Sequence, residues 1–189
     1  MKVKNLNNSS AKTKKLIRKT FAEMLSEKKE IRKISVSDLV KRANINRSTF
    51  YSHYNDIYGV AEDYENDLVD FFFDNATLLQ TSNSDQFFRK LFEYFRENEE
   101  NYKMMCKSND AVYLANKLTH LSECKLLELC YNSKSLKNKD MLEVELCVFI
   151  EGLVCQYIKY CRGTSEITPD ELYAFAKEWR NNFYQKHFT

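Results

Sequence analysis

The sequence predicts an all-α protein, on the basis of three observations. The chain of 189 residues contains three glycines and one proline, the residue types on which the tight turns between strands depend. It is rich in lysine, glutamate and leucine, which favour helices. Apolar residues make up 43% of the chain and recur at the spacing of helices that bury one face. A chain of this length forms one ordinary domain or two small ones.

The first predicted helix begins at Ser9 or Ser10, whose hydroxyl can cap its first turn. Residues 1–8 are polar, and we expect them to be disordered. The helix carries one apolar face at helical spacing, formed by Leu16, Ile17, Phe21, Met24 and Leu25.

Two short helices follow and are separated by a tight break. The first starts near Ser35, where Asp38 three residues later gives a weak capping-box signal. Its inner face consists of Leu39, Val40 and Ala43, and the break is Asn44-Ile45. The second starts with Asn46 as N-cap and runs to about Tyr54, with Phe50 and Tyr54 four residues apart and pointing inward.

The rest of the chain predicts further helices over 57–79, 85–98, 101–107, 110–131, 140–162 and 169–187, with a loop at 79–85. Asp56 is placed to cap the first of these. Asp140 and Glu143 make an acidic start for the helix over 140–162, and Gly163 can end it in the left-handed conformation. Thr168 and Glu171, with Pro169 between them, form a specific capping box for the last helix.

Charge divides the chain into two parts. Residues 1–54 hold 14 lysines and arginines against four acidic residues, whereas residues 55–189 hold 15 against 23. A basic module joined to an acidic one indicates that the first part binds a polyanion. We therefore divide the chain after residue 56, into a basic module at 1–56 and a larger helical module at 57–189.

Two short helices around a tight break, the second with a polar outer face, are typical of a helix-turn-helix. In that motif the second helix enters the major groove of DNA, so Arg47, Ser48 and Thr49 in its first turn can reach base edges. Tyr51 and His53 are placed to donate to phosphate oxygens. No acidic residue occurs between residues 44 and 54. The predicted DNA-binding residues are Ser37, Asn46, Arg47, Ser48, Thr49, Tyr51, Ser52, His53, Lys12, Lys14 and Lys15.

Residues 34–60, ISVSDLVKRANINRSTFYSHYNDIYGV, resemble the DNA-binding domain of the TetR/AcrR family of bacterial transcriptional regulators. The likeness covers about residues 9–60, and its most specific part is TFYSHY at 49–54. Residues 149–172 resemble one branch of the family more loosely. The resemblance implies a helix-turn-helix DNA-binding domain at 1–56 and a regulatory and dimerisation domain at 57–189. It further implies a dimeric repressor that binds a palindromic operator and releases it when a small molecule enters the larger domain.

Two positions depart from the family pattern. Asn44 stands where the turn usually has Gly, and asparagine tolerates the left-handed conformation better than most residues. Ile57 stands where the family usually has a phosphate-binding lysine. We expect Lys12, Lys14 or Lys15 to compensate for the lost phosphate contact.

Aromatic side chains of the second domain are candidates for an apolar ligand pocket, although ordinary core packing explains any one of them. The candidate pocket residues are Phe72, Phe88, Phe92, Phe95, Tyr102, Met105 and Tyr113.

The helix over 140–162 is apolar nearly all round, so it must face both its own core and a second surface. The last helix has a cleaner apolar stripe. Pairing of both helices with their copies across a two-fold axis predicts a homodimer. The candidate interface residues are Phe149, Gly152, Leu153, Tyr157, Phe175, Trp179 and Phe183.

Other classes of protein receive little support. Phosphate-binding glycine loops, nucleophile elbows and HExxH motifs are missing, so we expect no enzyme, no cofactor and no metal site. No secretory signal or apolar run long enough for a membrane is visible, and we expect a cytoplasmic protein. Six cysteines without a CxxC pair favour buried thiols. The open alternatives are a cysteine redox-responsive regulator and an architectural DNA-binding protein without a ligand.

Overall fold

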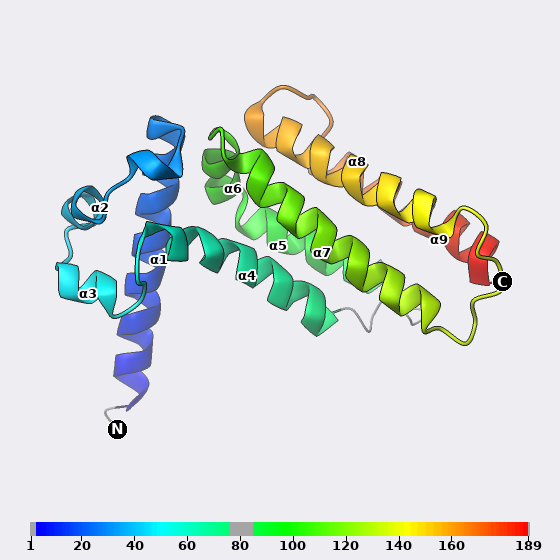
Figure 1. Ribbon diagram of the computed structural model, residues 1–189, viewed down its shortest axis with the longest axis horizontal. Helices are drawn as coiled ribbons and strands as arrows, with labels where there is room; N and C mark the ends of the chain where they lie inside the picture. Colours follow the sequence, from blue (N-terminus) through cyan, green and yellow to red (C-terminus); the bar gives the residue numbers. More distant parts are fainter. Residues whose placement is uncertain (1–2, 76–84, 189) are drawn as a thin grey trace. The chain divides into compact units, whose positions relative to one another are not determined.

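The computed structural model describes the backbone of residues 3–75 and 85–188, and their side chains except those of residues 3–8, 72, 73, 85, 113, 114 and 118. These residues form helices joined by turns, with no strand among them, which confirms the predicted all-α fold (Figure 1). The helices are α1 (Val3–Lys28), α2 (Val36–Ala43), α3 (Arg47–Tyr51), α4 (Ile57–Asn75), α5 (Asp85–Glu97), α6 (Glu99–Cys106), α7 (Ala111–Tyr131), α8 (Leu142–Arg162) and α9 (Pro169–Phe188), with a short 3-10 helix, η1 (Ile31–Lys33), between α1 and α2.

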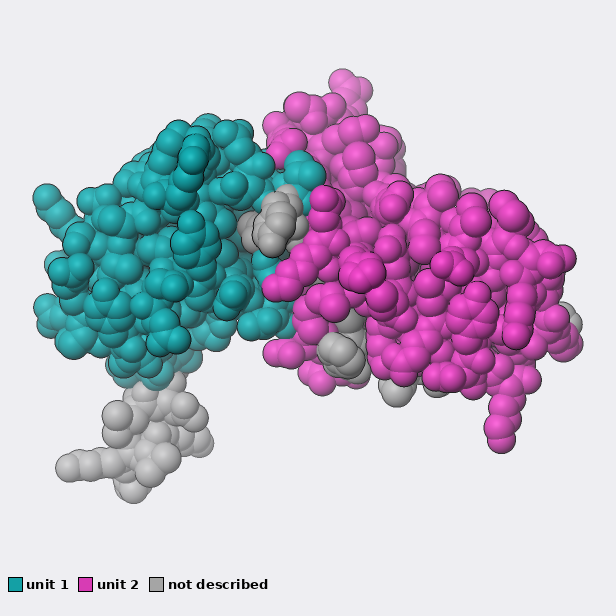
Figure 2. All heavy atoms as spheres, in the orientation of Figure 1, with its two compact units in different colours: residues 1–66, 100–112 teal, residues 67–99, 113–189 magenta. Residues whose placement is uncertain are grey.

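The chain divides into two compact units (Figure 2). Unit 1 consists of residues 1–66 and 100–112, and unit 2 of residues 67–99 and 113–189. The division differs from the sequence boundary at residue 56, because the first half of α4 buries Val60, Ala61 and Tyr64 within unit 1. The guanidinium of Arg18 on α1 lies 4.0 Å from the centre of the Tyr64 ring. The predicted loop at 79–85 falls largely on residues 76–84, outside the described residues.

Residues 100–112 belong to unit 1 because they hold the end of α1. The backbone N–H of Asn109 donates to the carbonyl of Lys29 at 2.8 Å, and the Asp110 carboxylate accepts from the N–H of Ile31 at 2.7 Å. Lys29 has a positive φ of 67°, so the chain turns sharply there. These two hydrogen bonds satisfy backbone groups that the end of a helix leaves without partners.

The local signals predicted in unit 1 appear in the structure, with two shifted boundaries. The Ser35 hydroxyl accepts from the N–H of Asp38 at 3.1 Å, and Asn44 is left-handed with φ 52° and ψ 49°. Helix α1 begins at Val3 instead of Ser9, because neither glycine nor proline interrupts residues 3–8. Helix α3 ends at Tyr51 instead of Tyr54.

Unit 2 packs α5, α8 and α9 around a shared apolar core. Its fully or nearly buried side chains include Phe87, Phe88, Leu91, Phe92, Leu142, Leu146, Phe149, Ile150, Leu172, Ala176 and Phe183. The capping box of α9 is confirmed: the Glu171 carboxylate accepts from the Thr168 N–H at 2.7 Å, and the Thr168 hydroxyl accepts from the Glu171 N–H at 3.3 Å. Gly163 ends α8 with φ 70°, as predicted.

The predicted start of α8 at Asp140 is wrong, although Glu143 does lie in the first turn of the helix. The helix begins at Leu142, after Met141 in the left-handed conformation with φ 60° and without a side-chain cap. The N–H of Asp140 instead donates to the side-chain oxygen of Asn138 at 2.9 Å. Leu142 is completely buried, and burying it sets where the helix enters the core.

The end of α9 is fastened to α8 and the preceding loop by His187, which is completely buried. Its Nδ1 donates to the carbonyl of Asn138 at 2.8 Å, and its Nε2 lies 3.2 Å from the Glu145 carboxylate. Lys186 also pairs with Glu145. Burial raises the pKa of Glu145, but hydrogen bonds from Lys186 and His187 outweigh it, so this pKa lies below its usual value.

We expect Glu145→Gln to lower the free energy of unfolding by about 1 kcal/mol at neutral pH, because glutamine keeps an acceptor oxygen but removes the negative charge that faces Lys186 and His187. The pKa of Glu145 is lowered in the folded state. Its contribution is therefore complete above the unfolded-state pKa and is lost as the pH falls through the folded-state pKa.

Denaturant titrations at neutral and acidic pH should show the difference between the two proteins shrinking as the pH falls below about 4.5, the ordinary pKa of glutamate. Glu166→Gln, at an exposed position in the loop between α8 and α9, is the control and should change little at either pH. A difference that stays constant with pH would contradict the role of the Glu145 charge.

Candidate functional site

The candidate nucleic-acid interface is built on α3, which is anchored by one fully buried ring. Phe50 has no exposed surface, and Tyr54, just after the helix, is 7% exposed. The left-handed Asn44 and the hydrogen bond from the Ile45 N–H to the Val40 carbonyl, 3.0 Å long, close the turn between α2 and α3. A short helix held in this way presents its other side to solvent.

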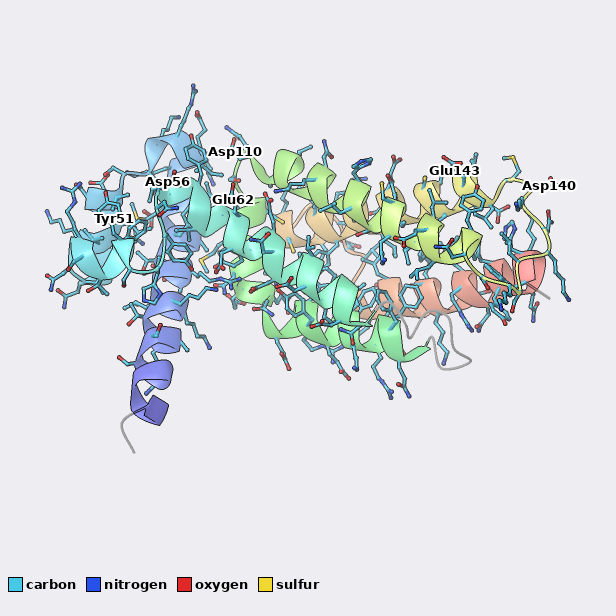
Figure 3. The ribbon with its side chains drawn as sticks, turned by 60° about the horizontal axis from the view of Figure 1, so that its bottom comes forward. Tyr51, Asp56, Glu62, Asp110, Asp140 and Glu143 are labelled. Atoms are coloured by element: carbon cyan, nitrogen blue, oxygen red, sulfur yellow. The ribbon has the colours of Figure 1, made fainter. Side chains whose placement is uncertain are left out.

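The predicted base-contacting and phosphate-contacting residues lie on that outer side or next to it. Tyr51, labelled in Figure 3, is 51% exposed, and its ring meets the edge of the Phe50 ring. His53 and Thr49 are half-buried. The exposed members of the predicted set are Ser37, Asn46, Arg47, Ser48, Tyr51 and Ser52.

Two of these side chains differ in the hydrogen-bonding groups that remain free to contact DNA. Asn46 occupies the N-cap position of α3, as predicted, but its side chain makes no capping hydrogen bond. The Ser52 hydroxyl donates to the Thr49 carbonyl at 2.8 Å, inside its own turn. Asn46 therefore keeps its full hydrogen-bonding capacity, whereas Ser52 keeps only its acceptor lone pairs.

Lys14 differs from the other two predicted lysines because it is paired inside unit 1. Its Nζ lies 2.7 Å from the carboxylate of Asp63 on α4. Arg18 approaches the same carboxylate at 3.3 Å, and the Tyr54 hydroxyl donates to it at 2.9 Å. Asp63 is 16% exposed. Its carboxylate joins α4 to α1, through Lys14 and Arg18, and to Tyr54 just after α3.

Asp63 is a residue that our sequence analysis missed. A signal was available, because a buried tyrosine hydroxyl usually finds a partner and Tyr54 was predicted to point inward. Burial, followed by the charge of the Asp63 carboxylate, raises the pKa of Tyr54 above its usual value. The Tyr54 hydroxyl therefore remains a donor across the physiological pH range, and the position after α3 stays fixed to α4.

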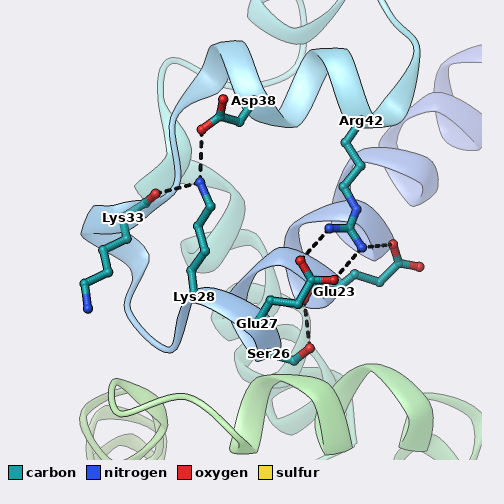
Figure 4. Close-up of polar contacts among 7 residues, drawn as sticks. All are labelled: Glu23, Ser26, Glu27, Lys28, Lys33, Asp38 and Arg42. Carbon is teal, nitrogen blue, oxygen red and sulfur yellow. Dashed lines mark hydrogen bonds and ion pairs between the residues drawn. The ribbon is translucent and has the colours of Figure 1, made fainter.

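Several other basic side chains of unit 1 are used to join α2 to α1 (Figure 4). Arg42 contacts the Glu27 carboxylate at 2.6 and 2.7 Å and Glu23 at 3.4 Å. Lys28 pairs with Asp38 at 3.0 Å and donates to the Lys33 carbonyl at 2.9 Å. Exposed pairs of this kind add little stability, but they engage the charges of Arg42 and Lys28 within unit 1.

The basic side chains of unit 1 that form no ion pair among the described residues include Lys12, Lys15, Lys19, Lys41 and Arg47. Lys12, Lys15 and Lys19 lie three and four residues apart on α1 and form one exposed row. Lys19 and Lys41 were absent from the predicted set. Their availability depends on which acidic residues the fold brings near each lysine.

The candidate pocket residues are divided between the two units. Tyr102 and Met105 are buried in unit 1. Phe88 and Phe92 are buried in the core of unit 2, and the half-buried Phe95 packs against that core. The side chains of Phe72 and Tyr113 lie outside the described residues. Phe88 also lines a hollow of about 100 Å³ within unit 2, whose other walls come from α7, α8, α9 and the loop before α8.

The candidate interface residues also divide by exposure. Phe149 and Phe183 are 7% and 8% exposed and belong to the core of unit 2. Leu153, Tyr157 and Trp179 are half-buried against the same core. Gly152 and Phe175 are exposed, and Phe175 is 54% exposed.

Helix α8 has a second, exposed apolar face. Val144 and Val148 are 50% and 63% exposed, and Gly152 and Cys155 continue the same row at helical spacing. A Cβ built on Gly152 would meet nothing within 4 Å inside the chain. The sequence prediction that α8 faces two ways is therefore supported, with Val144 and Val148 on the outward face.

Two other kinds of site have no candidate among the described residues. Among the described residues, no group of histidine, cysteine and acidic side chains is arranged to hold a metal ion. Within the same residues, no helix combines the length and apolar character needed to cross a membrane.

Comparison with known proteins finds a partial similarity. No protein-family model matches this sequence. A stretch of 53 residues is 36% identical to YxbF of Bacillus subtilis (strain 168), an uncharacterized HTH-type transcriptional regulator. The match covers 28% of this chain and 14% of that protein, so the chain spans about one seventh of the relative's length.

Proposed function

We propose that this protein is a sequence-specific, DNA-binding transcriptional regulator of the TetR/AcrR type. The main support for this proposal is α3. This helix has no acidic residue, is anchored by the buried Phe50, and exposes Arg47, Ser48 and Tyr51 to solvent. The similarity of a 53-residue stretch to an HTH-type regulator supports it. The protein acts in the cytoplasm, on double-stranded DNA, as a binding protein and not as an enzyme.

The finer proposal is a homodimeric repressor that leaves a palindromic operator when a small molecule binds unit 2. A two-fold dimer presents two copies of α3, which read two half-sites about one DNA turn apart. The exposed row of Val144, Val148, Gly152 and Cys155 on α8 is the surface that we assign to this dimer. It has the apolar character of a surface that a partner covers.

Selection of duplexes from a random pool at fixed salt tests the proposal directly. We expect enrichment of one sequence with two-fold symmetry, bound far more tightly than unrelated duplexes. Equal binding to all duplexes at matched salt would instead identify an architectural DNA-binding protein.

The lysine row of α1 gives a separate prediction. Lys12→Gln with Lys15→Gln should flatten the dependence of log affinity on log salt by about 1.8, at about 0.9 per phosphate contact. Lys14→Gln should leave that slope nearly unchanged and lower thermal stability, because Lys14 is engaged with Asp63.

Binding isotherms on one operator duplex over a series of salt concentrations supply the slopes. An unchanged slope in the double variant would remove Lys12 and Lys15 from the interface. A large slope change in Lys14→Gln would mean that its pairing with Asp63 gives way when DNA binds.

The redox alternative receives little support from Cys130 and Cys147, the two half-buried cysteines of unit 2. Burial raises the pKa of the Cys130 thiol to about 11. Burial, followed by neighbouring glutamates, also raises the pKa of Cys147. Since the thiolate is the reactive form, neither is well suited to sense oxidants at neutral pH.

A further inference from the structure

The hollow in unit 2 has walls made mainly of aromatic and aliphatic side chains. Trp179 contacts two other rings of the wall: it stacks on Phe149, with centroids 3.6 Å apart and planes 4° apart, and on Phe183, with centroids 4.6 Å apart. Phe88 and Leu146 close the inner side and are 6% and 4% exposed. Stacked rings of this kind form a preformed apolar surface, which costs little entropy to occupy.

One charged side chain lines the same hollow. Arg180 on α9 stacks over the Tyr184 ring at 5.0 Å and donates to the Asn181 side-chain oxygen at 3.0 Å. Within the described part of the chain it forms no ion pair with a carboxylate. The hydroxyls of Ser133 and Ser135 lie in the same lining.

We propose that this hollow binds a small apolar carboxylic acid, with its carboxylate on Arg180 and its hydrocarbon part against Trp179 and Phe149. A guanidinium prefers a carboxylate because it can offer two parallel hydrogen bonds, whereas a cationic ligand would be repelled. The volume of about 100 Å³ accommodates part of such a molecule, for example the first carbons of its chain. Binding of the acid does not depend on the proposed function. Only the role of this acid as the effector that releases DNA rests on the proposed function.

The chain carries its own reporter for this site, because Trp179 is its single tryptophan. Octanoate absorbs no light where tryptophan does, so titrating it into the full-length protein should change Trp179 emission in a saturable way. The uncharged isostere octanamide should bind about tenfold more weakly, since a hydrogen bond to a charged group contributes about 1.5–3 kcal/mol.

Variants separate the charged contact from the apolar one. Arg180→Gln should weaken octanoate about tenfold and leave octanamide unchanged, by the same charged-group magnitude. Arg89→Gln is the matched control, because Arg89 is an exposed arginine on α5 beside Phe88 and outside the lining. Phe188→Ala removes part of the apolar wall and should weaken both ligands equally, with circular dichroism confirming the fold.

Three results would overturn the proposal: no saturable change in Trp179 emission, equal affinities for octanoate and octanamide, or an Arg180→Gln variant that binds octanoate as well as the wild type. Emission that changes with protein concentration instead of octanoate would show that a second copy covers the hollow, which also overturns it. Operator binding is measured independently, so a protein that binds its operator but not octanoate loses this proposal alone.

Discussion

Arg47→Ala is expected to weaken operator binding by about 1–3 kcal/mol, which corresponds to roughly 5- to 150-fold, and to relax base preference at one position in each half-site. Arg47 is exposed in the first turn of α3 and forms no ion pair among the described residues, so nothing inside the chain competes with DNA for it. Isotherms on the operator, on single-base variants and on random DNA measure the effect.

Arg32→Ala is the matched control for this experiment. Arg32 is the same residue type in the same unit, but its side chain pairs with Glu30, which precedes η1. This control should change operator affinity little. If Arg47→Ala lost affinity equally for operator and random DNA, Arg47 would contact phosphate and not a base. Tyr51→Phe should weaken binding to operator and random DNA equally, because the Tyr51 hydroxyl is placed to donate to a phosphate.

Val148→Glu is expected to convert the dimer to a monomer and to weaken operator binding by at least about 100-fold, because two linked half-site contacts gain 10²- to 10⁴-fold in avidity. Val148 is 63% exposed in the middle of the α8 row, so the charge disrupts no contact of unit 2 itself. Charges at Phe149 or Phe183 would not separate the two effects, since both side chains belong to the core.

Sedimentation gives the oligomeric state, and circular dichroism verifies that Val148→Glu still folds. Val112→Glu makes the same substitution at a 48% exposed valine of unit 1 and should leave both dimer and affinity intact. A Val148→Glu protein that remains dimeric and binds the operator like the wild type would remove this face of α8 from the interface.

Much of the fold could be predicted because its signals are local. The Ser35 cap, the left-handed Asn44 and the Thr168–Glu171 capping box each involve residues within four positions of one another. Their hydrogen bonds and backbone preferences are present in almost any tertiary setting, so residue type and spacing are enough. The same holds for the polar outer side of α3, because Phe50 on the other side leaves few alternatives.

The sequence was less informative wherever distant residues compete for one side chain. Lys12, Lys14 and Lys15 look equivalent in the sequence, but the fold places Asp63 beside Lys14 alone among them. Asp140 does not cap α8 as expected, because its N–H donates to the Asn138 side chain and the helix starts at the buried Leu142. Ion pairs and burial across tens of residues depend on packing, which residue spacing does not encode.

The sequence by itself determined that this protein is helical and that its basic part carries a helix-turn-helix, and it predicted that α8 is apolar on more than one face. Only the tertiary structure decided which face of α8 turns inward, placing Phe149 in the core and Val148 in solvent. The sequence of a helix that is apolar all round does not show which face is buried, because the free energy of burial depends on the apolar area and not on its direction. For the same reason only packing placed Arg180 beside the Trp179 hollow.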